Sequence, residues 1–335
     1  MMTNAERIHA ESIVFDAACP LAVVGTWYES WVKGGATAIA PTVAWPNDDT
    51  AGAVRRITDY LGMIAKDPRL MLIERADQFH EAKRTNRMGI VFHFQTPYPF
   101  ARDLSLVRMF HKLGVRMVQI TYNVKNSVGD GCEERTDCGL SKFGIKLIKA
   151  LNSQGVVVDL SHTGYRTTME AMEVSEHPCV FSHSNPKTVH DSVRNISDDQ
   201  IKAVAQRGGV IGLNATAYFI ATKTQPTMKD LVAHVKYIAD LVGVDYIGVG
   251  LDYYEGMSSV ASDEEAWRLY NSFVAEGVWA PPTYVPPPWH FPREIRLPEN
   301  LPNLTVALAE GGFHEEEIKK VLGLNFLRVF KQCWK

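Results

Sequence analysis

The sequence lacks any long apolar run, since no stretch approaches the ~18 consecutive apolar residues that build a membrane-spanning helix. The N-terminal segment, MMTNAERIHAES, also lacks the apolar core of a signal peptide. Clustered basic charge is missing too: the 35 Lys and Arg residues are scattered, and the formal net charge is −3. We therefore expect a cytoplasmic protein that acts on a small-molecule substrate and binds neither membranes nor nucleic acids.

Cysteine is scarce and shows no pattern. The chain has five cysteines, an odd number, and no two of them form a CxxC pair. Such usage is typical of reduced thiols, although Cys132 and Cys138 could pair within one loop. The fold must then rest on its hydrophobic core, for which 46% apolar residues in 335 are sufficient.

What the sequence does contain is a regular alternation of short apolar runs with longer amphipathic ones. The short runs predict eight strands, at residues 13–16, 36–43, 90–95, 117–122, 156–161, 179–182, 210–214 and 246–252. Helical periods occupy residues 141–154, 197–207 and 227–242, and Ser197 with Gln200 forms a capping box. Eight strand-then-helix units predict an α/β protein with a (β/α)8 TIM barrel.

We expect residues 1–335 to form a single TIM-barrel domain with two departures from the repeat. Residues 44–89 hold two helical patterns between the second and third strands, and an insertion rich in proline and aromatic residues occupies about 253–300. A closing helix is expected at about 314–332, where the sequence reads HEEEIKKVLGLNFLRVFKQ.

The aromatic residues of the insertion could form a lid over the barrel mouth, or they could simply pack a long loop against the rim. A lid of this kind would exclude water and suit a cationic or aromatic substrate. Its candidate members are Trp267, Trp279, Trp289, Tyr253, Tyr254 and Tyr284, and three tryptophans after the first two strands could face the same mouth, namely Trp27, Trp31 and Trp45.

The carboxyl ends of the predicted strands are mostly polar. Catalytic groups of such barrels come from these ends, so the last residue of each run is the informative one. The residues concerned are Asp16, Gln95, Tyr122, His162, His183, Asn214 and Asp252.

Two histidines stand out among these polar ends. The run VVVDLSH ends at His162, and CVFSHS on the next strand contains His183. Neutral imidazoles on adjacent strands can converge on one Zn²⁺, which needs two or three protein ligands and an open position for water. A lone histidine is more often a hydrogen-bonded core residue, but two at matching strand ends favour a metal or active site.

Asp252 and Arg194 have candidate roles beside the histidines. Asp252 ends the run YIGVGLD, where it could ligate the metal or move a proton from water to a leaving amine. Arg194 lies in SVRNISDDQ, where its guanidinium could clamp a substrate carboxylate through two hydrogen bonds or form a surface salt bridge.

Several segments together resemble the membrane (renal) dipeptidases, zinc-dependent barrel hydrolases of the amidohydrolase superfamily. The segments are LGVRMVQITYNVKNSVGDG, GVVVDLSHTGYRTTMEAMEVSEHPCVFSHSN, RNISDDQIKAVAQRGGVIGLN, HVKYIADLVGVDYIGVGLD and LGLNFLRVF. They cover most of residues 113–252 and the last helix. The resemblance implies a barrel of the metal-dependent hydrolase type that cleaves dipeptides and similar small amides, and family members are often dimers.

The resemblance also implies roles for single residues. His162 and His183 correspond to two histidines of one metal site, Asp252 to the acid/base beside the metals, and Arg194 to the clamp on the substrate carboxylate. Tyr122 takes the place of a histidine that contacts the reacting carbonyl, and a neutral phenol can still donate a hydrogen bond there. We expect Tyr122 and Asn126, both in the segment ITYNVKN, to contact the substrate.

Two features of the family's metal centre are absent from this sequence. A His-x-Asp pair on the first strand usually supplies the second zinc, and the corresponding residues are Ala18 and Pro20. The bridging glutamate at the end of the third strand is Gln95, a much weaker ligand that carries no charge. We therefore expect one zinc ion rather than two, on His162 and His183 with help from Gln95 or Asp252.

The function predicted from the sequence is hydrolysis of an amide bond in a small molecule that carries a carboxylate. Two alternatives remain open. One is a metal-free or singly metallated lyase or isomerase that acts on a small amine or acid, in which His162, His183, Asp252 and Tyr122 do acid–base work. The other is a non-catalytic binding protein on a dipeptidase scaffold that has lost its activity.

Overall fold

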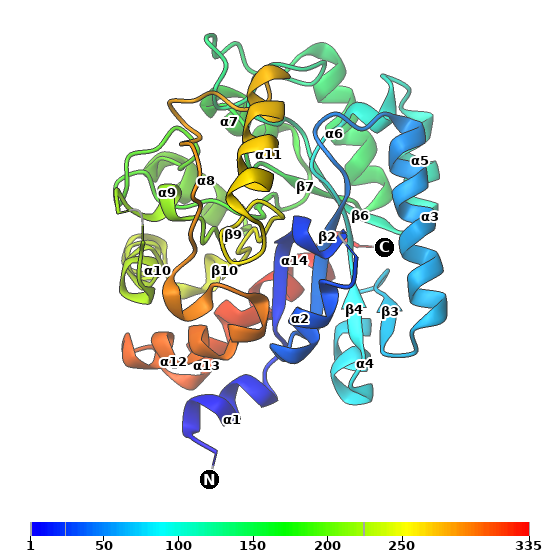
Figure 1. The fold of residues 1–335 in the computed structure, drawn as a ribbon. Helices are drawn as coiled ribbons and strands as arrows, with labels where there is room; N and C mark the ends of the chain where they lie inside the picture. The colour runs from blue at the N-terminus through cyan, green and yellow to red at the C-terminus, as the bar shows by residue number, and fades with distance from the viewer. Residues whose placement is uncertain (1, 24, 224, 335) are drawn as a thin grey trace.

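The computed structural model, which describes residues 2–23, 25–223 and 225–334, contains a closed barrel of eight parallel strands. The barrel closes because β1 pairs with both β2 and β10 (Figure 1). The predicted (β/α)8 TIM barrel is thereby confirmed. Its strands are β1 (Phe15–Cys19), β2 (Ala38–Ala44), β4 (Met88–Ile90) continued by β5 (Phe92–Phe94), β6 (Val115–Gln119), β7 (Val157–Asp159), β8 (Val180–Phe181), β9 (Val210–Leu213) and β10 (Ile247–Val249).

One strand of the sheet lies outside the predicted eight. β3 (Leu70–Leu72) pairs in parallel with β4 at the amino end of the third barrel strand. It belongs to the long link at residues 44–89, whose two predicted helices are present as α3 (Thr50–Lys66) and α4 (Gln78–Thr85). A run of three apolar residues is too short to be distinguished from loop by its period.

The other helices follow the strands or close the ends of the barrel. Ser197 and Gln200 form the predicted capping box, and Ser141 caps the helix predicted from residue 141. The helices are α1 (Asn4–Glu11), α2 (Tyr28–Lys33), α5 (Ser105–Lys112), α6 (Lys142–Gln154), α7 (Tyr165–Val174), α8 (Asp198–Gln206), α9 (Ala217–Ile220), α10 (Met228–Val242), α11 (Asp263–Ala275), α12 (Pro302–Glu310), α13 (Glu315–Lys319) and α14 (Asn325–Cys333).

The first strand runs further than predicted, which changes the place of Asp16. β1 continues to Cys19, so Asp16 lies inside the strand and not at its end, and the sequence-based strand end was wrong. Its carboxylate accepts hydrogen bonds from Trp31 Nε1 and from the backbone nitrogen of Leu251, both at 2.9 Å. Asp16 therefore joins the first strand to α2 and to the segment after β10, while burial raises its pKa to about 6.

The insertion predicted as a proline-rich and aromatic segment also contains a helix that the sequence reasoning did not identify. α11 lies above the strands in Figure 1, at the opposite end of the molecule from α1. The single domain and the closing helix at about 314–332 stay predictions. The final helical segment is formed by α13 and α14 with a π-helical turn between them. Within the described ranges, no helix is both long enough and apolar enough to cross a membrane. All five cysteines are free.

Aromatic rings from α14 fill the amino end of the barrel. Phe326 and Phe330 contact the ring of Phe15 edge to face, with centroids 5.3 and 5.4 Å apart. Gly248 on β10 makes this possible, because a Cβ there would overlap the ring of Phe326. The closing segment therefore belongs to the hydrophobic core that holds the strands together.

Replacing Phe326 by alanine should lower the free energy of unfolding by about 3–5 kcal/mol, because the side chain is fully buried and leaves a cavity. Urea denaturation measures the loss. Phe326→Leu keeps most of the volume and should cost only about 1 kcal/mol. Equal effects of the two substitutions would show that the ring does not support the barrel in this way.

Candidate active site

A small chamber of about 40 Å³ lies at the carboxyl end of the barrel. A cavity this size has room for only a few water molecules, at ~10–15 Å³ each. Residues from the strand ends form its floor, and residues from the insertion form its roof. The floor includes Pro20, Trp45, Gln95, Tyr122, His162 and Asp252, and the roof includes Tyr254, Leu269, Phe273, Trp279 and Tyr284.

The roof is a stack of aromatic rings. Trp279 lies flat against Tyr284 and Phe273, with ring centroids 4.6 Å apart in both pairs. Its indole nitrogen donates a hydrogen bond of 3.3 Å to the hydroxyl of Tyr122 on the floor. The insertion thus closes over the strand ends, as a lid would.

Only part of the predicted aromatic lid faces the chamber. Tyr254, Trp279 and Tyr284 line it, whereas Tyr253 and Trp289 are buried in the packing behind and Trp267 is 44% exposed. Of the three earlier tryptophans, Trp45 lines the chamber, Trp27 lines a neighbouring pocket and Trp31 bonds Asp16. The lid is therefore formed by one part of the insertion.

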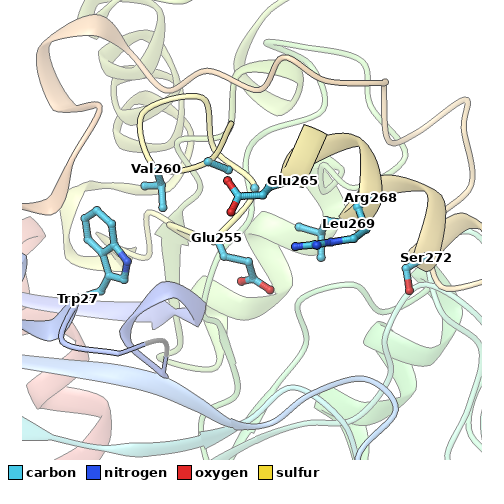
Figure 2. Close-up of a pocket in the computed structure, with 9 residues that line it drawn as sticks. Trp27, Glu255, Val260, Glu265, Arg268, Leu269 and Ser272 are labelled. Atoms are coloured by element: carbon cyan, nitrogen blue, oxygen red, sulfur yellow. The ribbon is translucent and has the colours of Figure 1, made fainter. Parts of the chain in front are cut away.

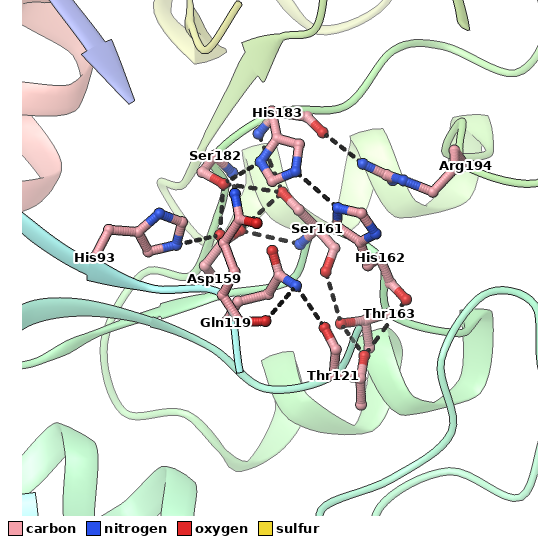
Figure 3. A network of polar contacts seen from close by, with 11 residues as sticks. His93, Gln119, Thr121, Asp159, Ser161, His162, Thr163, Ser182, His183 and Arg194 are labelled. Carbon is pink, nitrogen blue, oxygen red and sulfur yellow. Dashed lines mark hydrogen bonds and ion pairs between the residues drawn. The ribbon is translucent and has the colours of Figure 1, made fainter. Parts of the chain in front are cut away.

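The two predicted histidines touch each other directly. Nε2 of His162 lies 2.8 Å from Nε2 of His183, and both side chains are buried (Figure 3). Burial, together with the charge of Arg194, holds the pKa of both imidazoles well below the ordinary value. Both rings are therefore neutral near pH 7, which is the state in which imidazole binds a metal ion.

The partners on the far side of each ring fix its proton. The amide nitrogen of Asn123 donates to the Val278 carbonyl, so its oxygen must accept the 2.7 Å hydrogen bond from Nδ1 of His162. Ser182 Oγ lies 2.6 Å from Nδ1 of His183 and 2.5 Å from the carboxylate of Asp159. Because the serine hydroxyl donates its hydrogen bond to the carboxylate, Nδ1 of His183 must donate to the serine oxygen. The Nε2 lone pairs of the two histidines then face each other.

Asp159 anchors this network beneath the histidines. Its carboxylate accepts hydrogen bonds from the backbone nitrogens and hydroxyls of Ser161 and Ser182 and pairs with Nε2 of His93 at 3.0 Å. Burial by itself would raise the pKa of Asp159, but its interaction with His93 and the hydrogen bond from Ser182 hold it below the ordinary value. Asp159 is therefore a buried carboxylate.

Asp252 lies at the edge of the chamber with its backbone in the left-handed region. Its φ is +64°, which is uncommon outside glycine, and its carboxylate accepts a 3.0 Å hydrogen bond from Asn214. Burial raises the pKa of Asp252 to about 7, although Arg194 and Asn214 oppose the shift. His162 has the same φ of +64°. Strained backbone of this kind clusters at functional sites.

Tyr122 stacks on the ring of His162. The two ring centroids are 3.9 Å apart and the planes differ by 22°. Burial raises the pKa of the Tyr122 phenol. The hydroxyl therefore keeps its proton near neutral pH. Tyr122 and His162 both line the chamber.

Arg194 lies on the other side of His162. Its Nη2 donates to the His183 carbonyl at 3.3 Å, and the guanidinium lies 5.3 Å from the ring centroid of Phe219. Nε and Nη1 have no hydrogen-bond partner although the residue is only 2% exposed. Arg194 and His162 together line a side cavity of about 330 Å³, and His162 also lines the chamber, so the two spaces meet at this side chain.

The structure brings Gln95, Tyr122, His162 and Asp252 to one chamber but does not bring Asn126 there. The Asn126 amide nitrogen donates to the Ile120 carbonyl at 3.0 Å, and its oxygen accepts from the backbone nitrogen of Val128 at 2.7 Å. These bonds shape the loop after β6, and Asn126 is not a lining residue of the chamber. Contact between Asn126 and a substrate stays a prediction.

The sequence reasoning missed the residues that support the histidines. Asn123 and Ser182 lie next to Tyr122 and His183, Asp159 lies three positions before His162, and His93 lies two positions before Gln95. Side chains two apart on a strand point to the same face, so this spacing would have placed His93 inside the barrel. No comparable pattern indicated that Asn123 or Ser182 would bond an imidazole.

Comparison with known proteins identifies the family. The family model of the membrane dipeptidases, peptidase family M19, matches residues 27–277. This chain belongs to the membrane dipeptidase family. An uncharacterized dipeptidase of Schizosaccharomyces pombe is 30% identical over 250 residues, which are 73% of this chain and 53% of that protein. Dipeptidase verJ of Clonostachys rogersoniana is 27% identical over 266 residues, 78% of this chain and 59% of that protein.

Solved structures show the same fold over the whole chain. An amidohydrolase from Pseudomonas aeruginosa superimposes with a TM-score of 0.88 at 30% identity and 99% coverage of both chains. A metallo peptidase from Rhodobacter sphaeroides, liganded with a phosphinate mimic of the dipeptide L-Ala-D-Ala, has a TM-score of 0.80 at 18% identity, covering 97% of this chain and 100% of that one. The chain spans little more than half the length of the curated relatives.

The membrane dipeptidases are metallopeptidases, so a metal ion would bind to donor atoms of the chamber residues. Ala18 and Pro20 offer no ligand, and among the described residues no group of three or more His, Cys, Asp and Glu could hold an ion. Two facing imidazole lone pairs nevertheless require a cation between them. The number of ions that this site would hold stays a prediction.

Gln95 completes the donor set available to a single ion. It is 3% exposed, lines the chamber beside His162, and its amide nitrogen has no hydrogen-bond partner. An amide presents either its oxygen or its nitrogen after a flip of the group, and the oxygen is a possible ligand. Each histidine also has the hydrogen-bonded Nδ1 that is usual for a metal ligand.

Replacing Asp159 by asparagine should lower the free energy of unfolding by about 3–5 kcal/mol, because the buried donors around it lose their anionic acceptor. The pKa of Asp159 is lowered in the fold, so its stabilisation is complete above the unfolded value of about 3.9 and declines as the pH falls below it. Urea unfolding of both proteins between pH 3 and 7 measures this. The control is Asp191→Asn, at a side chain 85% exposed, which should change little.

Proposed function

We propose that this protein hydrolyses an amide bond in a small molecule that carries a carboxylate. Membership of the dipeptidase family supports the reaction class. The observation that carries the proposal is Asp252, a carboxyl group with a pKa of about 7 in a closed chamber that it shares with His162 and Tyr122. A group with a pKa near the working pH transfers protons most effectively.

Asp252 is the general base and acid of the proposed reaction. As a carboxylate it takes a proton from the attacking water, and as a carboxylic acid it gives this proton to the departing amine. The hydrogen bond from Asn214 orients the carboxyl group toward the chamber side of the barrel. The aromatic roof excludes bulk water, which strengthens each polar interaction inside.

Arg194 binds the carboxylate of the substrate in this proposal. Nη1 has no hydrogen-bond partner, and it shares with Nη2 the terminal edge of the guanidinium, which can donate two hydrogen bonds to the paired oxygens of a carboxylate. A buried guanidinium without a bound anion is costly, so an anionic ligand in the side cavity is favoured. The scissile amide then lies close to His162, which lines both this cavity and the chamber.

Tyr122 donates a hydrogen bond to the carbonyl oxygen as negative charge develops on it. His162 and His183, with Gln95, would hold one metal ion. When bound, such an ion acts as a Lewis acid that lowers the pKa of water. Asn123, Ser182 and Asp159 keep the two imidazoles in the tautomers that this requires. Zinc as that ion, a homodimer and a cytoplasmic location stay predictions.

Asp252→Asn should lower kcat by a factor of about 10²–10⁴ with a small change in KM. In the wild type, the base must be deprotonated, so kcat/KM should rise with pH and reach half its maximum near pH 7. The pH profile of the variant should lose this limb. The assay is amide hydrolysis with a panel of dipeptides and N-acyl amino acids. A pH limb that persists in the variant would assign the titration to another group.

Metal analysis of the purified protein should find one equivalent of metal per chain. Removing it with a chelator, or replacing His183 by alanine, should lower turnover at least about 100-fold, and His80→Ala at an exposed histidine should leave turnover and metal content unchanged. Two equivalents would contradict the single-ion site. Full turnover without metal would favour the lyase or isomerase, and unchanged ligand affinity with no turnover would favour the binding protein.

A further inference from the structure

The chamber has a neighbour with which it shares two side chains. An outer pocket of about 520 Å³ lies between α11 and the segment after β1, and it is lined by Trp27, Glu265 and Arg268 among others (Figure 2). Glu255 and Leu269 line both this pocket and the chamber. Glu255 therefore lies where the outer pocket meets the chamber.

The carboxylate of Glu255 lacks a counterion. Its Oε2 is buried without a hydrogen-bond partner, and no ion pair to Glu255 is found in the described part of the chain. Arg56 is the one cation that acts on its pKa, and the guanidinium of Arg56 is already paired with Asp48 at 2.7 Å. Burial raises the pKa of Glu255, although a hydrogen bond from its own backbone N–H and the charge of Arg56 oppose the shift.

The surroundings of Glu255 in the chamber also favour positive charge. The lining residues include a second carboxyl group, Asp252, and no lysine or arginine. Aromatic side chains of Trp45, Trp279 and Tyr254 also line the chamber, and Arg56 already lies over the Trp45 ring, 5.7 Å from its centroid. Gln95, which is 3% exposed, also presents an unpartnered amide nitrogen. Several polar groups at the chamber therefore lack the ligand that would satisfy them.

We propose that Glu255 binds a protonated amine of the substrate and thereby sets its specificity. A primary or secondary ammonium supplies the N–H donor that Oε2 lacks, whereas a quaternary ammonium cannot. This inference rests on the proposed function in one respect: with Arg194 holding a carboxylate, the substrate is dipolar. Its ammonium lies at Glu255, and its carboxylate lies on the other side of His162.

Arg268 is the competing partner for Glu255. It extends from α11 over the outer pocket, as Figure 2 shows, but forms no ion pair with Glu255 within 4.0 Å. If Arg268 neutralised Glu255 in solution, removing the carboxylate would leave amine binding unchanged. The same measurement therefore decides between the two partners.

Binding of n-butylammonium and of uncharged n-butanol, whose alkyl chains can extend from Glu255 into the outer pocket of about 520 Å³, tests the proposal without any need for turnover. Fluorescence of Trp45 and Trp279, which line the chamber, reports binding. We expect the wild type to prefer the amine, and Glu255→Gln to weaken amine binding at least ~10-fold while butanol binding stays the same. Glu265→Gln is the matched control, because Gln can replace Glu in the capping box with Ser262 and should leave both affinities unchanged.

Two further measurements complete the test. Glu255→Asp keeps the charge and should restore part of the amine preference, which a merely structural role would not do. In the hydrolysis assay, Glu255→Gln should raise KM for substrates with a free amine but not for their N-acetylated forms. Equal binding of amine and alcohol by the wild type would overturn the proposal. Amine binding without amide hydrolysis would overturn the proposed function alone and leave the amine site standing.

Discussion

The carboxylate of Asp159 is the interaction on which the rest of the site depends. It lies fully buried at the end of β7, where it accepts hydrogen bonds from Ser161 and Ser182 and pairs with His93. A buried carboxylate is tolerated only with such a complete set of donors. Because Asp159 accepts the hydrogen bond from the Ser182 hydroxyl, it decides the tautomer of His183 and hence the chemistry at the centre of the barrel.

The site combines this rigid floor with strained and polar groups that do not stabilise the fold. His162 and Asp252 both have a φ of +64°, and Arg194 is buried without full pairing. Such features cost free energy, and the packed core around the strands and α14 offsets that cost. The aromatic insertion then closes the chamber, which keeps water away from groups that act through charge and hydrogen bonding.

Much of the fold and several site residues were predictable from the sequence, and the failures have physical reasons. The eight strands were found because each is an apolar run bounded by a helix. β3 was missed since three residues carry too little pattern, and β1 was ended at Asp16 because a polar residue usually leaves the core. The position of Gln95, Tyr122, His162 and Asp252 at one chamber was predictable because the carboxyl ends of barrel strands meet at one end of the barrel.

The sequence by itself determined the fold class and the absence of ligands at Ala18 and Pro20, because hydrophobic period and residue type are local properties of the chain. Only the tertiary structure decided that Asp16 accepts a hydrogen bond from the backbone nitrogen of Leu251 across the barrel closure. It also decided that Arg194 lines a side cavity next to His162. Burial, proton positions and missing partners arise where distant segments pack together. The buried, unpartnered oxygen of Glu255 therefore arises only where the barrel and the insertion enclose it.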